Sequence, residues 1–377
     1  MDERILDVSS EQLKALVRTV LGEHDIDLGA WDAVPLIGGA GAYSTARSLI
    51  LLRGVAYIGR SERPWSLIAK GFAPVAARDD PADIHYRKRE WLLYRSGLLE
   101  SLPVGMSAPR CYGCEELGNG EIRLWLEHVQ ENTDRLWPLE RWALAAQHLG
   151  RFNGTYLHER RLPRVAWLGG RRLRSWVEHH ASLVARIAAA PDNPEVQHWW
   201  PRSVVDAILQ LWTERDAMCT VLEGLPQTFC HGDAIRRNLF ARGRPGSPED
   251  TVGIDWEYAG RYAVGEEVGQ TLSVASAFFD VTPAQLPALD DALFEGYLTG
   301  LREVGWHGDP RLVRLAYSIH AALRNSFNAV GATVPDEARR PEILRNYGHT
   351  WEELAERRAA IRPFLLERAD EARRLID

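Results

Sequence analysis

The chain has 377 residues and a mass of 42.5 kDa, a length that favours two domains or lobes over one. A formal net charge of −7 argues against a nucleic-acid-binding surface, which needs a basic patch or stripe. No apolar run reaches the roughly 18 residues of a membrane span, and the acidic, polar residues 1–12 do not resemble a secretory signal. We therefore expect a cytoplasmic protein without a nucleic-acid or membrane partner.

The first third of the chain combines helices with short strands. Ser9 and Gln12 form a capping-box pattern and are followed by apolar residues at helical spacing, which predicts an amphipathic helix over 9–22. Between residues 34 and 75, short apolar runs separated by glycine predict a small antiparallel sheet. Three further elements complete this part: a helix from about Asp83 to Ser96, and strands over 108–116 and 121–129.

Cys111 and Cys114 form a CxxC pair inside the first of these two later strands. Residues three apart in a regular strand face opposite sides, so we expect the two thiols to point apart. No second pair follows at the spacing of a zinc ribbon. The pair is therefore interpreted as structural.

Beyond about residue 132 the pattern becomes helical and encloses one β-rich insert over 229–241 and 251–260. Helices are expected from near Pro138 and near 171–189, 202–223, 285–303, 310–329 and 350–376. We predict an α+β fold of two lobes, a small antiparallel-sheet lobe and a larger helical lobe. The expected division is an N-terminal helical extension over 1–28, the sheet lobe with a hinge over 29–130, and the helical lobe over 131–377.

The residues that could carry chemistry cluster in the β-rich insert. Phosphoryl transfer needs metal ions on the phosphates and a carboxylate that accepts the hydroxyl proton. Asp233 on a tight loop can act as that base, and Asn238, five residues later, can offer an amide oxygen to Mg²⁺. Asp255 follows an apolar strand and can bind the same metal, while His231 would brace the loop.

The segment HGDAIRRN followed by IDWE resembles the Brenner motif and the metal-binding aspartate of the aminoglycoside phosphotransferase and choline kinase superfamily. The resemblance covers about residues 35–301 and is most specific between Phe229 and Gln270. It implies a two-lobed protein-kinase-like fold. It also implies a base role for Asp233 and Mg²⁺-ligand roles for Asn238 and Asp255.

The resemblance extends upstream to a nucleotide site. A glycine-rich stretch is similar to the family's phosphate-covering loop, and its candidate residues are Gly38, Gly39, Gly41, Ser44 and Thr45. Lys70 matches the phosphate-binding lysine and is one of only three lysines against 42 arginines. Glu90 is its expected partner on the following helix. Glu127, His128 and Val129 resemble the hinge that would pair with the purine.

The sequence departs from the family pattern at two places. Gln270 stands where the family often has a second aspartate, a residue that usually braces the structure. Arg236 and Arg237 stand between the base and the asparagine. They could reach phosphate or the acceptor, or only face solvent, and we favour solvent.

The acceptor is indicated by charge alone. Residues 262–301 contain no Lys or Arg but six carboxylates, which would suit a cationic acceptor such as an aminoglycoside. The other interpretation, a solvated helix face, stays open. Candidate acceptor contacts are Asp280, Glu257 and Glu267.

The predicted function is therefore an ATP- or GTP-dependent, Mg²⁺-requiring phosphotransferase that acts on a hydroxyl of a small molecule. An aminoglycoside-like antibiotic or an amino sugar is the favoured acceptor. A housekeeping kinase for homoserine, choline or a sugar would share every catalytic residue. A nucleotide-binding pseudo-kinase that serves as a regulatory module is the alternative from another class. Oligomeric state is left open.

Overall fold

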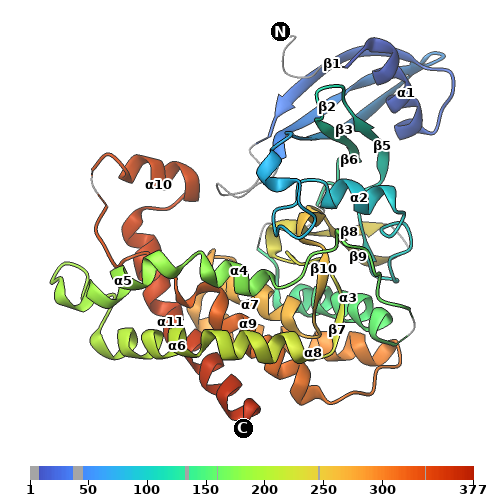
Figure 1. Ribbon diagram of the computed structural model, residues 1–377. Coiled ribbons are helices and arrows are strands. Elements are labelled where there is room, and N and C mark those ends of the chain that lie inside the picture. Colours follow the sequence, from blue (N-terminus) through green and yellow to red (C-terminus); the bar gives the residue numbers. More distant parts are fainter. Residues whose placement is uncertain (1–7, 37–45, 132–135, 159, 245–246, 336) are drawn as a thin grey trace.

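The computed structural model describes residues 8–36, 46–131, 136–158, 160–244, 247–335 and 337–377. An antiparallel sheet with one helix on it forms the upper lobe, and helices form most of the lower one (Figure 1). The predicted α+β, two-lobed, kinase-like fold is confirmed. The predicted phosphate-covering residues Gly38, Gly39, Gly41, Ser44 and Thr45 lie outside the described residues.

The upper sheet has the strand order β1-β2-β3-β6-β5, with every neighbouring pair antiparallel. Because side chains alternate along a strand, Leu67 and Ala69 of β3 lie in the core beneath helix α1, whereas Lys70 belongs to the opposite face. The elements are α1 (Ser10–Leu21), β1 (Asp27–Pro35), β2 (Ala46–Ile58), β3 (Ser61–Phe72), β5 (Cys111–Glu116) and β6 (Ile122–Glu127).

Helix α1 forms as expected, with the Ser9 hydroxyl accepting from the Gln12 N–H at 3.2 Å. Its Leu13, Leu16 and Val17 are buried in the same core as the sheet. The division at residues 28 and 130 stays a proposal, and α1 would belong to the sheet lobe by its packing.

Helix α2 (Arg89–Arg95) is shorter than the predicted helix over 83–96. The carboxylate of Asp83 accepts from the His85 N–H at 2.6 Å, and that of Asp80 accepts from the Ala82 N–H at 2.9 Å. These local turns satisfy backbone donors in a non-helical way, so the helix starts later.

The expectation that Cys111 and Cys114 point apart is wrong. The register of β5 against β6 shifts between Cys111 and Gly113, which marks a β-bulge. An extra residue in the strand reverses the alternation of side chains, so the two Sγ atoms lie 3.4 Å apart on one side.

The lower lobe is built from nine helices within the described residues. They are α3 (Leu139–His158), α4 (Arg172–Glu178), α5 (Ala181–Ala189), α6 (Arg202–Gly224), α7 (Glu266–Ala277), α8 (Leu286–Glu303), α9 (Pro310–Ser326), α10 (Arg340–Tyr347) and α11 (Trp351–Ile376). The single helix predicted over 171–189 is two helices. The rings of His179 and His180 bond the carbonyls of Ser175 and Trp176, where the helix breaks.

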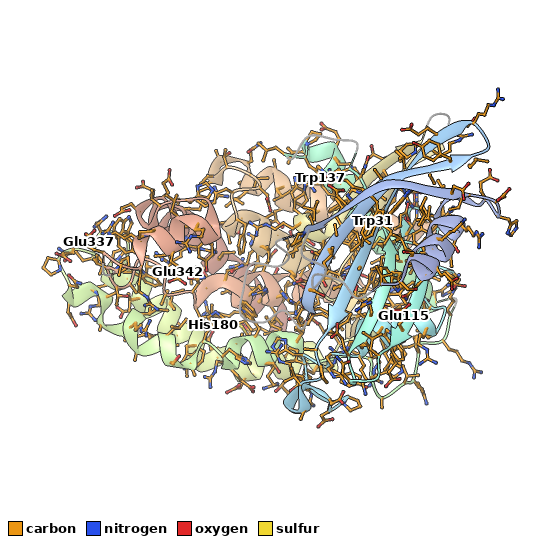
Figure 2. The ribbon with its side chains drawn as sticks, turned by 90° about the horizontal axis from the view of Figure 1, so that it is seen from above. Trp31, Glu115, Trp137, His180, Glu337 and Glu342 are labelled. Carbon is orange, nitrogen blue, oxygen red and sulfur yellow. The ribbon has the colours of Figure 1, made fainter. Side chains whose placement is uncertain are left out.

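Helix α10 was not predicted from the sequence. It buries none of its own residues, and so it lacks the apolar spacing that marks the other helices. Seen from above, Glu337 and Glu342 lie toward the opposite end of the molecule from Trp31 and Glu115 of the sheet lobe (Figure 2).

Short strands fill the region between the sheet lobe and helices α3 and α8 (Figure 1). Strand β7 (Gln227–Cys230) pairs with β10 (Gly260–Ala263), and β8 (Leu239–Arg244) pairs with β9 (Ser247–Gly253). Strand β4 (Met106–Ser107) runs parallel to β9. These strands carry the loops on which Asp233 and Asp255 stand. Among the described residues, no helix is long and apolar enough to cross a membrane.

Candidate active site

The loop after β7 holds Asp233 in place through two neighbours. His231 is fully buried, accepts from the Asp233 N–H at 3.2 Å through Nδ1 and donates from Nε2 to the carbonyl of Ile254 at 2.9 Å. Burial lowers the pKa of His231 to about 4, which keeps the ring neutral for this arrangement. Gly232 has a φ of +78°, and a Cβ there would lie 2.1 Å from the carbonyl oxygen of Tyr258. His231 therefore braces the turn, as its sequence position indicated.

The carboxylate of Asp233 accepts three hydrogen bonds. Arg172 Nη1 and Gln270 Nε2 each donate to Oδ1 at 2.7 Å. Asn238 Nδ2 donates to Oδ2 at 3.0 Å and also to the Asp233 carbonyl. Burial alone would raise the pKa of Asp233, but the charges of Arg172 and Arg324 outweigh it and lower the pKa below its usual value. The group is thus ionised at neutral pH.

Lys70 joins the two lobes at this site. Its Nζ lies 2.6 Å from Glu90 Oε2 on α2 and 2.5 Å from Asp255 Oδ1, which follows β9. Burial lowers the pKa of Lys70, but the carboxylates of Asp255 and Glu90 outweigh this and raise the pKa above its usual value. The structure therefore brings together the predicted lysine, its predicted glutamate and the predicted metal-binding aspartate.

Asn238 and Asp255 leave oxygen atoms available. The amide nitrogen of Asn238 is committed to Asp233, which orients Oδ1 away from that contact. Asp255 has a φ of 62° and a side chain that is 33% exposed. No group of three or more His, Cys, Asp or Glu side chains suited to a metal occurs in the part of the chain that the structure describes. Mg²⁺ prefers oxygen ligands, usually one or two from the protein and the others from phosphates and water. Asn238 and Asp255 therefore fit this ion.

The side chains of the predicted hinge are engaged within the protein. Arg242 Nη1 pairs with Glu127 Oε1 at 3.2 Å, and His128 Nδ1 lies 3.1 Å from the hydroxyl of Ser66. Val129 is 9% exposed. If these residues meet a nucleotide, they would do so through their backbone.

The predicted acceptor contacts do not face a common space. Glu267 is 2% exposed and accepts from the Gly232 N–H at 2.8 Å and from Asn153 Nδ2 at 3.1 Å. Burial raises the pKa of Glu267 to about 7. Glu257 is buried near Lys70, and Asp280 lies beside Arg357. Glu267 thus holds the catalytic loop from beneath.

The expectation that Arg236 faces solvent is wrong. Its side chain is buried and donates to Glu131 Oε2 at 2.9 Å and to the carbonyl of Leu239 at 3.2 Å. Arg237 is exposed, with its guanidinium 4.6 Å from the centre of the Phe278 ring.

Three arginines were missed by sequence reasoning: Arg172 and Arg324, which act on Asp233, and Arg358, which acts on Arg324. In a chain with 42 arginines no single one stands out, and these three come from helices far apart in sequence. Gln270 was noted only as a substitution, although it donates directly to Asp233.

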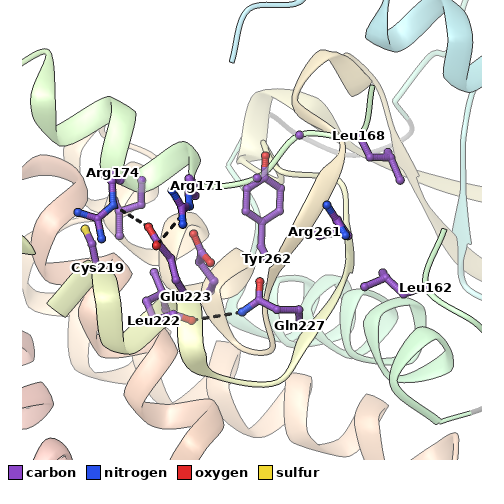
Figure 3. A pocket seen from close by; sticks show the side chains of 14 residues that line it. Leu162, Leu168, Arg171, Arg174, Cys219, Leu222, Glu223, Gln227, Arg261 and Tyr262 are labelled. Atoms are coloured by element: carbon purple, nitrogen blue, oxygen red, sulfur yellow. Dashed lines mark hydrogen bonds and ion pairs between the residues drawn. The ribbon is translucent and has the colours of Figure 1, made fainter. Parts of the chain in front are cut away.

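A cavity of about 370 Å³ is lined by residues of α4, α6 and β10 (Figure 3). Arg171 and Arg174 reach Glu223 across its wall, and Gln227 donates to the carbonyl of Leu222. Asp233, Asn238 and Asp255 are not among its lining residues. The cavity is therefore separate from the catalytic loop.

A sheet lobe that supplies a lysine–glutamate pair, above a helical lobe that supplies a buried aspartate loop, defines a kinase-like phosphotransferase. Residues 98–307 match the model of the phosphotransferase enzyme family, and the chain belongs to this family. It is thus a phosphotransferase that acts on hydroxyl groups of small molecules.

Solved structures agree with the fold. A microcompartment-associated aminopropanol kinase has a TM-score of 0.52 and 15% identity, covering 96% of this chain and 99% of that chain. A mutant of aminoglycoside 2'-phosphotransferase-IIIa in its GDP complex has a TM-score of 0.50 and 12% identity, covering 94% and 98%. No curated protein sequence matches the chain.

Proposed function

We propose that this enzyme transfers the γ-phosphoryl group of ATP or GTP to a hydroxyl of a small molecule, with Asp233 as the general base. The observation that carries the proposal is the position of the Asp233 carboxylate. It is ionised and bound by Asn238, whose backbone carbonyl accepts from the N–H of Ile254, the residue before Asp255, at 2.9 Å. A base must accept the acceptor's proton while the phosphates are held nearby.

Each neighbouring residue has a defined task in this proposal. Lys70, kept protonated by two carboxylates, binds phosphate oxygens, and Glu90 orients it. Asn238 Oδ1 and Asp255 would hold Mg²⁺, which when bound neutralises charge on the phosphates. Asp233 accepts the hydroxyl proton on an oxygen of its carboxylate, while His231 and Glu267 fix the turn that carries it.

The nucleotide would enter between the lobes. The backbone of Glu127, His128 and Val129 would bind the purine edge, and Gly38, Gly39, Gly41, Ser44 and Thr45 would cover the phosphates. We keep both ATP and GTP as donors, since one of the similar structures is a GDP complex. A pseudo-kinase is disfavoured because Lys70, Asp233, Asn238 and Asp255 are all present and close together, and a module that only binds nucleotide does not need a base.

The test is Asp233→Asn, which keeps the shape and removes the proton acceptor. We expect kcat to fall by roughly a factor of 10² to 10⁴, while nucleotide binding measured by calorimetry stays within about twofold. Asp291→Asn on the exposed surface of α8 is the matched control and should behave as the native enzyme. An Asp233→Asn variant with native turnover of any accepted substrate would show that another group is the base.

A further inference from the structure

Arginines gather on the side of the catalytic loop that faces helices α4, α9 and α11. Arg172 on α4 donates to Asp233. Trp176 lies one turn further along α4, and the guanidinium carbon of Arg324 on α9 lies 3.4 Å from the centre of its ring. Arg324 is therefore close enough to Asp233 and Arg172 to interact with both electrostatically.

Arg358 reaches the same region from α11. Its guanidinium carbon lies 5.5 Å from the centre of the Phe278 ring, and that of Arg237, the neighbour of Asn238, lies 4.6 Å from the same ring. Arg324 and Arg358 also repel each other electrostatically. The two arginines thus stand together beside the loop that carries Asp233 and Asn238.

Neither Arg324 nor Arg358 forms a direct ion pair with a carboxylate among the described residues, although Arg324 feels the charge of Asp233. Arg358 is 5% exposed, and its Nε and Nη1 are buried without a hydrogen-bond acceptor there. Arg324 is half-buried and its guanidinium stacks on the Trp176 ring. Burial lowers the pKa of Arg324 to about 9 and that of Arg358 to about 10. The nearby charge of Asp233 is already shared with Arg172, so two further neighbouring cations are unfavourable unless a ligand supplies another negative charge.

Other buried arginines of the chain do have acceptors. Arg314 is bound by Asp290 and Glu371, and Arg172 by Asp233. Arg89, Arg357 and Arg362 bind backbone carbonyl oxygens. The other buried arginines each pair with a carboxylate: Arg87, Arg123, Arg141 and Arg236. The lack of a direct partner within the described part of the chain therefore distinguishes Arg324 and Arg358 and is not a general property of an arginine-rich fold.

Asp280 interacts electrostatically with Arg357, next to Arg358 in sequence, and the other carboxylates of residues 262–301 are bound elsewhere or exposed. Asp290 is bound by Arg314 and Arg368, and Glu266 Oε1 lies 3.2 Å from His320 Nδ1. Asp291 and Glu295 are exposed on α8, which packs against α3. The acidic composition that suggested a cationic acceptor is therefore used elsewhere in the fold.

We propose that Arg324 and Arg358 bind an oxyanion group of the acceptor, a carboxylate or a phosphate, and so present the acceptor's hydroxyl to Asp233. Guanidinium groups are suited to this because their planar array of N–H donors matches the oxygens of such groups. The acceptor is thus an acidic hydroxylated small molecule. This inference rests on the proposed function, since it uses the same catalytic loop.

The first experiment measures anion binding without turnover. Inorganic phosphate and malonate are titrated separately by calorimetry into the protein saturated with Mg²⁺ and a non-hydrolysable ATP analogue, with chloride as the ionic-strength control. We expect binding to the native protein and a loss of at least about tenfold in affinity in Arg324→Met and in Arg358→Met. Arg302→Met, an exposed position on α8, is the matched control and should bind as the native protein does. The anion that binds more tightly identifies the group.

Thermal unfolding separates a ligand site from a structural role. Without anion, Arg358→Met should melt no lower than the native protein, because the charge that it removes is in no ion pair with the described residues. Arg314→Met should melt lower, because it leaves Asp290 and Glu371 unpaired. Equal anion affinity in the native protein and both variants would overturn the inference.

The second experiment compares acceptors of opposite charge by release of nucleoside diphosphate. The pairs are 4-hydroxybutyrate with 4-amino-1-butanol, and glycerol 3-phosphate with glycerol. We expect turnover of the acidic members, with KM raised at least about tenfold in the two variants and the nucleotide KM unchanged. Equal turnover of the amino or neutral members in native and variant enzymes would contradict this inference alone. Absence of transfer to every acceptor would count against the proposed function, while the anion titration still decides the role of the arginines.

Discussion

The charge of Asp233 depends on its hydrogen-bond donors. Gln270 donates to Oδ1 at 2.7 Å. An amide can donate to a carboxylate, whereas a second carboxylate at this distance would repel it and raise its pKa. Gln270 is therefore part of the reason that Asp233 is ionised, and it offers a conservative test of the base.

We expect Gln270→Glu to raise the pKa of Asp233, because a second carboxylate would repel its negative charge. The base is active only when it is deprotonated. On lowering the pH, the variant would therefore lose activity earlier than the native enzyme, and the acid limb of its kcat/KM profile would lie at higher pH. At high pH, kcat should approach the native value. The measurement is the pH–rate profile between pH 4 and 9. Gln270→Met removes the donor without adding a charge and should shift the limb less, in the same direction. An unmoved acid limb in Gln270→Glu would mean that Asp233 does not control it.

At the level of single residues, the sequence was informative where function depends on close spacing. Asp233, Asn238 and Asp255 stand in one short segment, and the local pattern was enough to bring them together. Arg324 and Arg358 are 34 positions apart in sequence and far from that motif. They come together only through the packing of α9 and α11, which gives neither of them a direct ion pair among the described residues. A local sequence pattern does not contain this information.

At the level of elements, β5 gives a prediction that a regular strand would not. Its bulge places Cys111 Sγ and Cys114 Sγ 3.4 Å apart, and Cys111 is exposed. The hydrogen bond between them lowers the pKa of Cys111, which favours the reactive thiolate. Bond formation needs the sulfurs to approach by only about 1.4 Å.

We therefore expect a disulfide reagent such as oxidised glutathione to convert these two thiols to a disulfide, with the reagent reduced to two thiols. Cys219 and Cys230 should stay reduced, because both are buried and burial raises their pKa. Peptide mapping by mass spectrometry and titration of free thiols check this. Cys111→Ser should retain three free thiols after the same treatment. Four free thiols in the oxidised native protein would contradict the prediction.

The elements that could not be predicted from the sequence have local causes. The central strands and the long helices follow from apolar periodicity, and they were predicted. The start of α2 was not, because the carboxylates of Asp80 and Asp83 form turns that compete with the helix. The break between α4 and α5 and the bulge of β5 were missed for a similar reason. Each depends on a local side-chain hydrogen bond or a change of register, which the apolar periodicity of the sequence does not show.

At the scale of the whole molecule, α2 is fixed to both lobes. Glu90 holds Lys70 of the sheet. Arg89, the preceding residue, is 1% exposed and donates to the carbonyl of Trp167 at 2.9 Å and to that of Glu257 at 2.9 Å, both in the lower lobe. It also donates to the carbonyls of Asp83 and Ile84. One buried guanidinium thus joins the helix that orients Lys70 to the segment that follows Asp255.

Arg89→Met should therefore affect stability and nucleotide binding together. It leaves four backbone carbonyls without their donor, so we expect the free energy of unfolding to fall by roughly 3 kcal/mol or more. Because α2 would no longer be held against Glu257, the Lys70–Glu90 pair would lose its fixed distance from Asp255, and affinity for the nucleotide should fall by about tenfold. Denaturant unfolding followed by circular dichroism measures the stability, and nucleotide calorimetry measures the affinity.

Arg95→Met, at the exposed end of the same helix with its guanidinium over Trp91, is the matched control and should leave both nearly unchanged. If Arg89→Met lowers stability but binds nucleotide as the native enzyme does, the two lobes are aligned by contacts other than α2.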